Sequence, residues 1–151
     1  MTFEEEYNEL IMKRDNLLKE KEINSEKIEK LNQLIDYYIW AYNSILYEEN
    51  YYHETVLSCQ KMLNRKKQPS VFYFSLFDAN FNRYYLNKIE YLKNKIKEVQ
   101  KKKNSIENIM IIKKRERKNL IQKNKKIDFY LEEARENIND KKIFLKPNFD
   151  K

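Results

Sequence analysis

The sequence predicts an all-α protein built as a long antiparallel two-helix coiled-coil hairpin. Three observations support this fold: the 151 residues include no glycine, two long stretches carry a heptad repeat, and one break near residues 64–75 separates them. A helical chain can do without glycine, whereas sheets, tight turns and phosphate-cradling loops seldom can. We therefore expect a single helical hairpin domain over residues 1–151.

The first helix is expected over about residues 3–63. Two series of residues, each stepping by seven, alternate there at spacings of three and four, as in a coiled coil. Seven of eight members of the first series and five of eight of the second are apolar or aromatic. The series are Phe3, Leu10, Leu17, Asn24, Leu31, Tyr38, Ile45 and Tyr52, and Tyr7, Arg14, Lys21, Ile28, Ile35, Tyr42, Glu49 and Val56.

The second helix is expected over about residues 76–142, after a break at 64–75. Pro69 has no amide hydrogen and disfavours helix in the residue before it. Pro147 ends regular structure, so residues 143–151 should form an irregular tail. The two heptad series of this helix are Tyr85, Leu92, Val99, Ile106, Lys113, Leu120, Ile127 and Ala134, and Ile89, Ile96, Lys103, Met110, Arg117, Asn124, Leu131 and Ile138.

Charge favours a hairpin over the alternative, in which the two helices stay in line and pair with another chain. Residues 1–36 have a net charge of −4, and residues 93–126 a net charge of +11. Folding back near residue 68 sets 1–36 beside roughly 100–135, so that opposite charges meet. A parallel dimer would instead place the basic segment against its own copy.

Six polar residues interrupt the heptad series near the two termini. Buried basic residues are costly unless they are paired. We therefore expect the basic members to reach glutamates of the other helix, or to await a partner. The six are Arg14, Lys21, Asn24, Lys113, Arg117 and Asn124.

Catalysis and metal binding are not expected. One histidine, His53, and one cysteine, Cys59, cannot assemble a zinc site or an oriented catalytic triad. No glycine is present to let backbone approach a phosphate, so we expect no enzyme activity and no cofactor. The first ten residues lack the apolar run of a signal peptide, no apolar stretch is long enough to span a bilayer, and a cytoplasmic location is expected.

A basic cluster in the second half is the first candidate binding site. It comprises Lys113, Lys114, Arg115, Arg117 and Lys118. The cluster is either a solvated face that lies beside the acidic residues 1–36 or a surface that binds an acidic protein. The third alternative is a nucleic-acid site, but the basic residues do not alternate with aromatic ones as they do in single-strand binding surfaces.

Aromatic residues around the break form the second candidate site. Fifteen of the 21 aromatic residues lie between Tyr37 and Tyr91, more than one seam of a two-helix hairpin can bury. Those outside the strict heptad series form either an exposed protein interface or a thicker local core. The candidates for an interface are Trp40, Tyr47, Tyr51, Phe74, Phe77 and Phe81.

In length and layout the chain resembles a known family. A hairpin with aromatics near its bend and a second arm rich in lysine, arginine and glutamate, ending in residues 113–120 and 130–135, looks like the central-stalk proteins of type III secretion and flagellar export, the FliJ, YscO and SpaM/InvI family. No invariant motif defines that family. The asparagine- and tyrosine-rich composition and the Pro69 break depart from its pattern.

The resemblance implies a non-enzymatic protein that couples a hexameric export ATPase to a membrane export gate and handles secretion chaperones. It implies a cytoplasmic location at the base of the secretion apparatus, flagellar or virulence-associated. The basic cluster would meet the ATPase, with Arg115 and Arg117 foremost, and the aromatic residues would meet the gate's cytoplasmic domain. The rival interpretation is a structural coiled-coil adaptor or tether without a secretion role.

Overall fold

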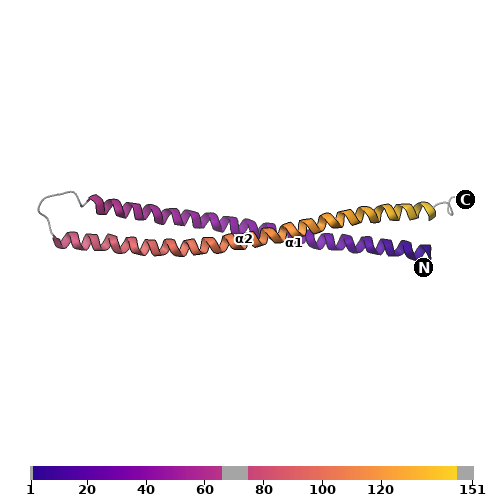
Figure 1. Ribbon diagram of the computed structural model, residues 1–151, viewed down its shortest axis with the longest axis horizontal. Coiled ribbons are helices and arrows are strands. Elements are labelled where there is room, and N and C mark those ends of the chain that lie inside the picture. The colour runs from indigo at the N-terminus through magenta and orange to yellow at the C-terminus, as the bar shows by residue number, and fades with distance from the viewer. Residues whose placement is uncertain (1, 66–74, 146–151) are drawn as a thin grey trace. The chain divides into compact units, whose positions relative to one another are not determined.

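The chain is an all-α helical hairpin of two long helices, α1 (Phe3–Arg65) and α2 (Ser75–Leu145), shown in Figure 1. The computed structural model describes residues 2–65 and 75–145, without the side chains of 75–78 and 145. The helix ends lie within three residues of the expected ones. Residues 143–145, expected in an irregular tail, continue α2. Pro69 and most of the expected break lie outside the described residues.

Helix α1 begins with a reciprocal cap that the sequence analysis did not single out. The amide of Glu5 donates to Thr2 Oγ1 at 3.2 Å, and the amide of Thr2 donates to Glu5 Oε2 at 3.0 Å. This capping box satisfies donors that the first helical turn leaves without partners. Glu4, Glu5 and Glu6 in the first turn also suit the positive end of the helix dipole.

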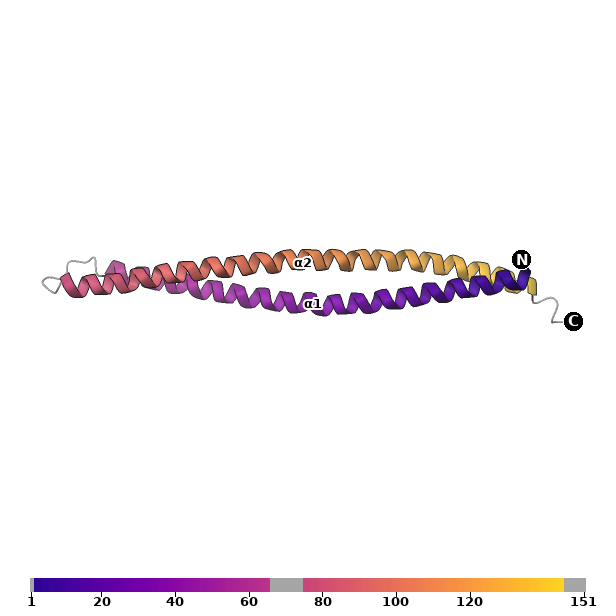
Figure 2. The same cartoon turned by 90° about the horizontal axis from the view of Figure 1, so that it is seen from below.

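The hairpin divides into two compact units. The terminal unit comprises residues 1–35 and 112–151, and the central unit comprises residues 36–111. In each unit one segment of α1 and one segment of α2 lie side by side and antiparallel (Figures 1 and 2). Each unit therefore has its own apolar seam between two helical segments.

The seam in each unit follows the predicted heptad series. Of the eleven buried residues in the described chain, ten belong to those series, and Cys59 is the next step of seven after Tyr52. In the central unit, Val56 and Cys59 of α1 pack with Ile89, Leu92 and Ile96 of α2. The periodic apolar stripe is thus what holds the two helices together.

The register of the pairing differs from the expected one. Glu6 pairs with Lys141, Lys21 with Asp128, and Glu49 with Lys103. Residues 1–36 therefore lie opposite about 113–143, which carry eleven basic and six acidic residues, net +5, rather than most of the +11 segment. The reason is that seam residues set the register of a coiled coil, so the midpoint of the break does not determine it.

The basic residues of the seam find various partners, and few of them are glutamates of the other helix. Lys21 reaches Asp128 across the seam, and Arg117 Nη1 donates to Asn32 Oδ1 at 2.9 Å. Lys113 instead lies 3.6 Å from Glu116 of its own helix. Arg14 likewise contacts its neighbour Asp15 at 3.2 Å. The longer side chains leave the seam at its edge, which keeps their charges near water.

Label distances within the terminal unit test this register. In a Cys59→Ser background, labels at Lys21→Cys and Asp128→Cys should lie about 10–20 Å apart, the interhelical spacing plus linkers. Labels at Lys21→Cys and Arg115→Cys should be separated by a further ~20 Å along the helix axis, because 13 residues intervene at about 1.5 Å each. A shorter distance for the second pair would instead support folding back near residue 68.

Candidate protein-binding surfaces

The basic cluster on α2 of the terminal unit separates into seam and surface residues. Lys113 and Arg117 are half-buried members of the heptad series, with the partners described above. Lys114, Arg115 and Lys118 are exposed, and the described residues give none of these three an ion pair. We call these three residues the basic surface, because their charges remain available to a partner.

Four aromatic residues form a second stripe on α1 of the central unit. Tyr37, Trp40, Tyr47 and Tyr51 follow the same alternation of three and four as the seam, with Ser44 filling the remaining position. At 100° per residue these positions lie nearly opposite the seam. We call them the aromatic stripe.

The side chains of the aromatic stripe are open to solvent. Trp40, Tyr47 and Tyr51 are 65%, 80% and 60% exposed, and the rings of Tyr37 and Trp40 lie 6.1 Å apart. Helix α1 has no lysine or arginine between Lys30 and Lys61. Exposed tyrosine and tryptophan at helical spacing are typical of a protein interface.

The remaining aromatic candidates lie elsewhere. Phe74 lies outside the described residues, and so does the side chain of Phe77. Phe81 is half-buried, with its ring 4.6 Å from the seam residue Tyr85. The Glu49–Lys103 pair places Tyr51 level with about residue 101 of α2, some 20 residues or ~30 Å along the helix from Phe81. The structure therefore does not gather Phe81 with the aromatic stripe.

A polar layer inside the seam of the central unit was missed by the sequence analysis. Lys103 Nζ donates to Glu49 Oε2 at 3.1 Å, and both side chains are largely buried. Glu107 follows Lys103 by one turn of α2, and its Oε1 accepts a hydrogen bond from the hydroxyl of Tyr42 at 2.8 Å. The available signal was that Glu49 and Lys103 occupy seam positions and carry opposite charges.

These two hydrogen bonds raise the pKa of both donor groups. The bond to the Glu107 carboxylate raises the pKa of Tyr42 above its ordinary value of 10.0. The bond to Glu49 likewise raises the pKa of Lys103 above 10.5. Both groups hold their protons more tightly in the folded chain than in the unfolded one. The stabilisation is therefore complete below the unfolded pKa values and is lost as pH rises through the folded ones.

The two residue types most often tied to catalysis occupy ordinary positions. Cys59 is buried in the core of the central unit, and His53 Nε2 lies 3.7 Å from Glu49 on the same helix. Within residues 2–65 and 75–145, neither helix contains an apolar stretch of the length and hydropathy that crossing a bilayer requires.

The stability of the polar layer should depend on alkaline pH. Wild-type protein should lose thermal stability as pH rises above about 10, in part because Tyr42 and Lys103 give up their protons. Tyr42→Phe should show a shallower loss over this range, since it has no hydroxyl to titrate. Tyr47→Phe, at an exposed position of the same helix segment, serves as the control and should follow the wild type. Identical pH profiles for all three proteins would contradict the assignment.

Searches of protein-family models, curated proteins and solved structures find no match to this chain. The chemistry of the basic surface and the aromatic stripe is therefore the basis for inferring partners.

Proposed function

We propose that the chain is a non-enzymatic coupling protein that binds one partner through the basic surface and another through the aromatic stripe. The observation that carries this proposal is that two exposed surfaces of different chemistry occupy different units of one hairpin. Neither surface contributes to the seam, so neither is needed to hold the helices together. Tryptophan, tyrosine and arginine are enriched among the residues that contribute most of the binding energy at protein interfaces.

The specific form we propose is the central stalk of a type III protein secretion apparatus. An acidic surface of a hexameric export ATPase is the partner of Lys114, Arg115 and Lys118. The cytoplasmic domain of an export gate is the partner of Trp40, Tyr47 and Tyr51. The support is the resemblance in layout together with the unpaired cations and exposed rings. The protein would act in the cytoplasm at the base of the apparatus, where its partners include secretion chaperones.

Unpaired surface cations suit the first contact for a physical reason. Three exposed positive charges attract an acidic surface over about a Debye length, which speeds encounter and makes binding weaken with salt. They lie on the same helix as the exposed Ile112 and Ile121, which add apolar contact area on the terminal unit. Arg117 contributes indirectly, because its hydrogen bond to Asn32 links α2 to α1 beside the basic surface.

Charge reversal tests the ATPase contact. Lys114→Glu, Arg115→Glu and Lys118→Glu together should weaken binding to the export ATPase encoded in the same genome by at least ~10-fold, measured by titration calorimetry at low salt. Helicity by circular dichroism should be unchanged, because these side chains lie outside the seam. Lys97→Glu, Lys101→Glu and Lys102→Glu together, at three exposed positions of the central unit, control for the same loss of positive charge. Equal ATPase binding by the triple variant would remove the stalk mechanism and leave a coiled-coil adaptor as the function.

Aromatic truncation tests the second contact separately. Trp40→Ala with Tyr47→Ala should preserve ATPase binding and weaken binding to the cytoplasmic domain of the export gate, since exposed aromatic anchors account for much of the energy of protein interfaces. Tyr84→Ala, at an exposed tyrosine of α2, is the matched control. Tighter and more salt-sensitive binding to duplex DNA than to either protein would replace the proposal with a nucleic-acid function.

A further inference from the structure

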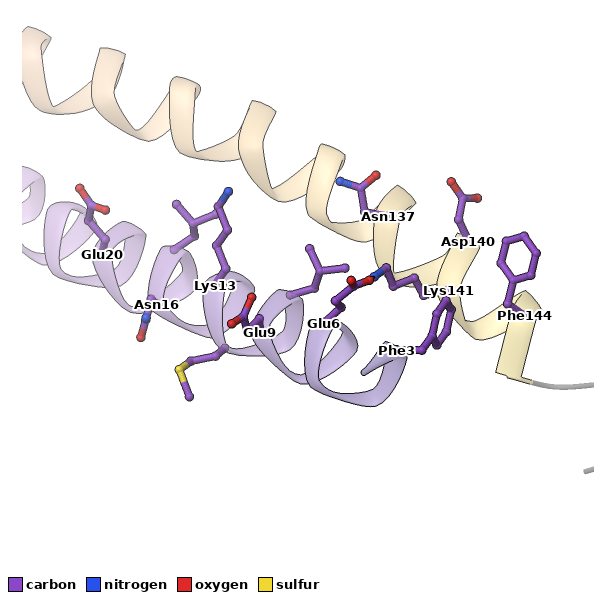
Figure 3. A pocket seen from close by; sticks show the side chains of 13 residues that line it. Phe3, Glu6, Glu9, Lys13, Asn16, Glu20, Asn137, Asp140, Lys141 and Phe144 are labelled. Atoms are coloured by element: carbon purple, nitrogen blue, oxygen red, sulfur yellow. The ribbon is translucent and has the colours of Figure 1, made fainter. Parts of the chain in front are cut away.

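The terminal unit contains a groove that neither proposed partner occupies. It has a volume of about 880 Å³ and is lined by residues of α1 between 3 and 20 and of α2 between 137 and 144 (Figure 3). Seventeen residues of helix extend about 25 Å, which is the length of four to five helical turns. The groove is therefore long enough for a short helix.

Apolar side chains are exposed along this groove. Leu10 and Leu17 are seam residues that are covered on one side only and remain half-buried. Met12 is 66% exposed and Phe144 is 72% exposed. At one end, the rings of Phe3 and Phe144 meet edge to face, 6.2 Å apart. A surface on which such residues gather is a binding site more often than a chance arrangement.

Carboxylates border the same groove. Glu6 is neutralised by Lys141, whose ammonium also lies 5.0 Å from the centre of the Phe3 ring, and Figure 3 shows these side chains meeting between the helices. Glu9, Glu20 and Asp140 have no ion pair with the described residues.

One lysine, Lys13, offsets these three carboxylates in the lining of the groove. The groove is therefore locally acidic in a chain whose net charge is +7. That charge is opposite to the charge of the basic surface, so the two sites select different partners.

We propose that this groove binds a cationic amphipathic helix of a partner protein. Apolar residues at helical spacing on that helix would pack against Leu10 and Leu17 and, at the end of the groove, Phe144, and its lysine or arginine residues would pair with Glu9 and Glu20. In helix-in-groove binding the apolar face of an amphipathic helix packs into an apolar groove, and carboxylates beside the groove select a helix with positive charge. The site is independent of the stalk proposal, since it involves neither the basic surface nor the aromatic stripe.

Two synthetic peptides provide the probes. Both are amphipathic helices with leucine at the same heptad positions, and one carries lysine where the other carries glutamate. The lysine peptide, labelled with a fluorophore, should bind the full-length protein with an affinity that falls as salt is added. The glutamate peptide should bind at least ~10-fold more weakly, because its charges repel those of the groove.

Variants of the protein test whether the peptide binds in the groove. Glu9→Lys with Glu20→Lys should weaken binding of the lysine peptide by ~10-fold or more, and Phe144→Ser should weaken it with less effect on salt dependence. Glu22→Lys with Glu26→Lys makes the same change in net charge at exposed positions outside the groove, and should leave the affinity nearly unchanged. Circular dichroism verifies that each variant is folded.

Three results would overturn the proposal. The first is equal binding of the two peptides, and the second is an equal loss of affinity in the control variant. The third is self-association of the chain that Glu9→Lys with Glu20→Lys abolishes and the lysine peptide competes away, which would assign the groove to a second copy. None of these measurements uses an export ATPase or export gate, so their outcome is separate from that of the proposed function.

Discussion

A pair of helices can bury one stripe of side chains on each, and this constraint governs the rest of the molecule. Both units satisfy it with the same heptad pattern, and the buried residues of the described chain fall on that pattern or on its next step. Everything else must face water or a partner. The basic surface, the aromatic stripe and the acidic groove all consist largely of residues that the seam has no room to cover.

Polar layers within the seam align the helices. Asn24 and Asn124 occupy facing seam positions in the terminal unit, and Asn124 Nδ2 donates to Ser25 Oγ at 3.2 Å. The described residues leave Asn24 Nδ2, a donor, and Asn124 Oδ1, an acceptor, buried without partners. Leaving such polar atoms buried without partners has a cost in stability. With Glu49–Lys103 in the central unit, such layers favour one register at a cost in stability, because any slip buries a polar group against apolar residues.

The sequence predicts the helices and the seam well because heptad spacing is local information. It predicts the register poorly, because folding back near residue 68 would place the acidic residues 1–36 beside most of the basic residues 93–126, and the structure does not. Register depends on which polar seam residues meet across the pair, and the length of the break does not reveal this. The sequence does not decide whether Trp40 and Tyr47 are exposed, because composition alone does not say whether a third helix covers them. No sequence pattern predicts the groove, because it forms only when residues 3–20 and 137–144 are brought together.

Amide hydrogen exchange tests the central claim, that the seam alone stabilises the hairpin and does so unevenly. The central unit contains the apolar cluster around Val56 and Leu92, whereas polar residues interrupt the seam of the terminal unit between residues 14 and 24 and between 113 and 124. Mass spectrometry of the intact chain should therefore find slow exchange in about 35–60 and 80–100, and fast exchange in about 8–26 and 111–126. Uniform protection along both helices would contradict the account.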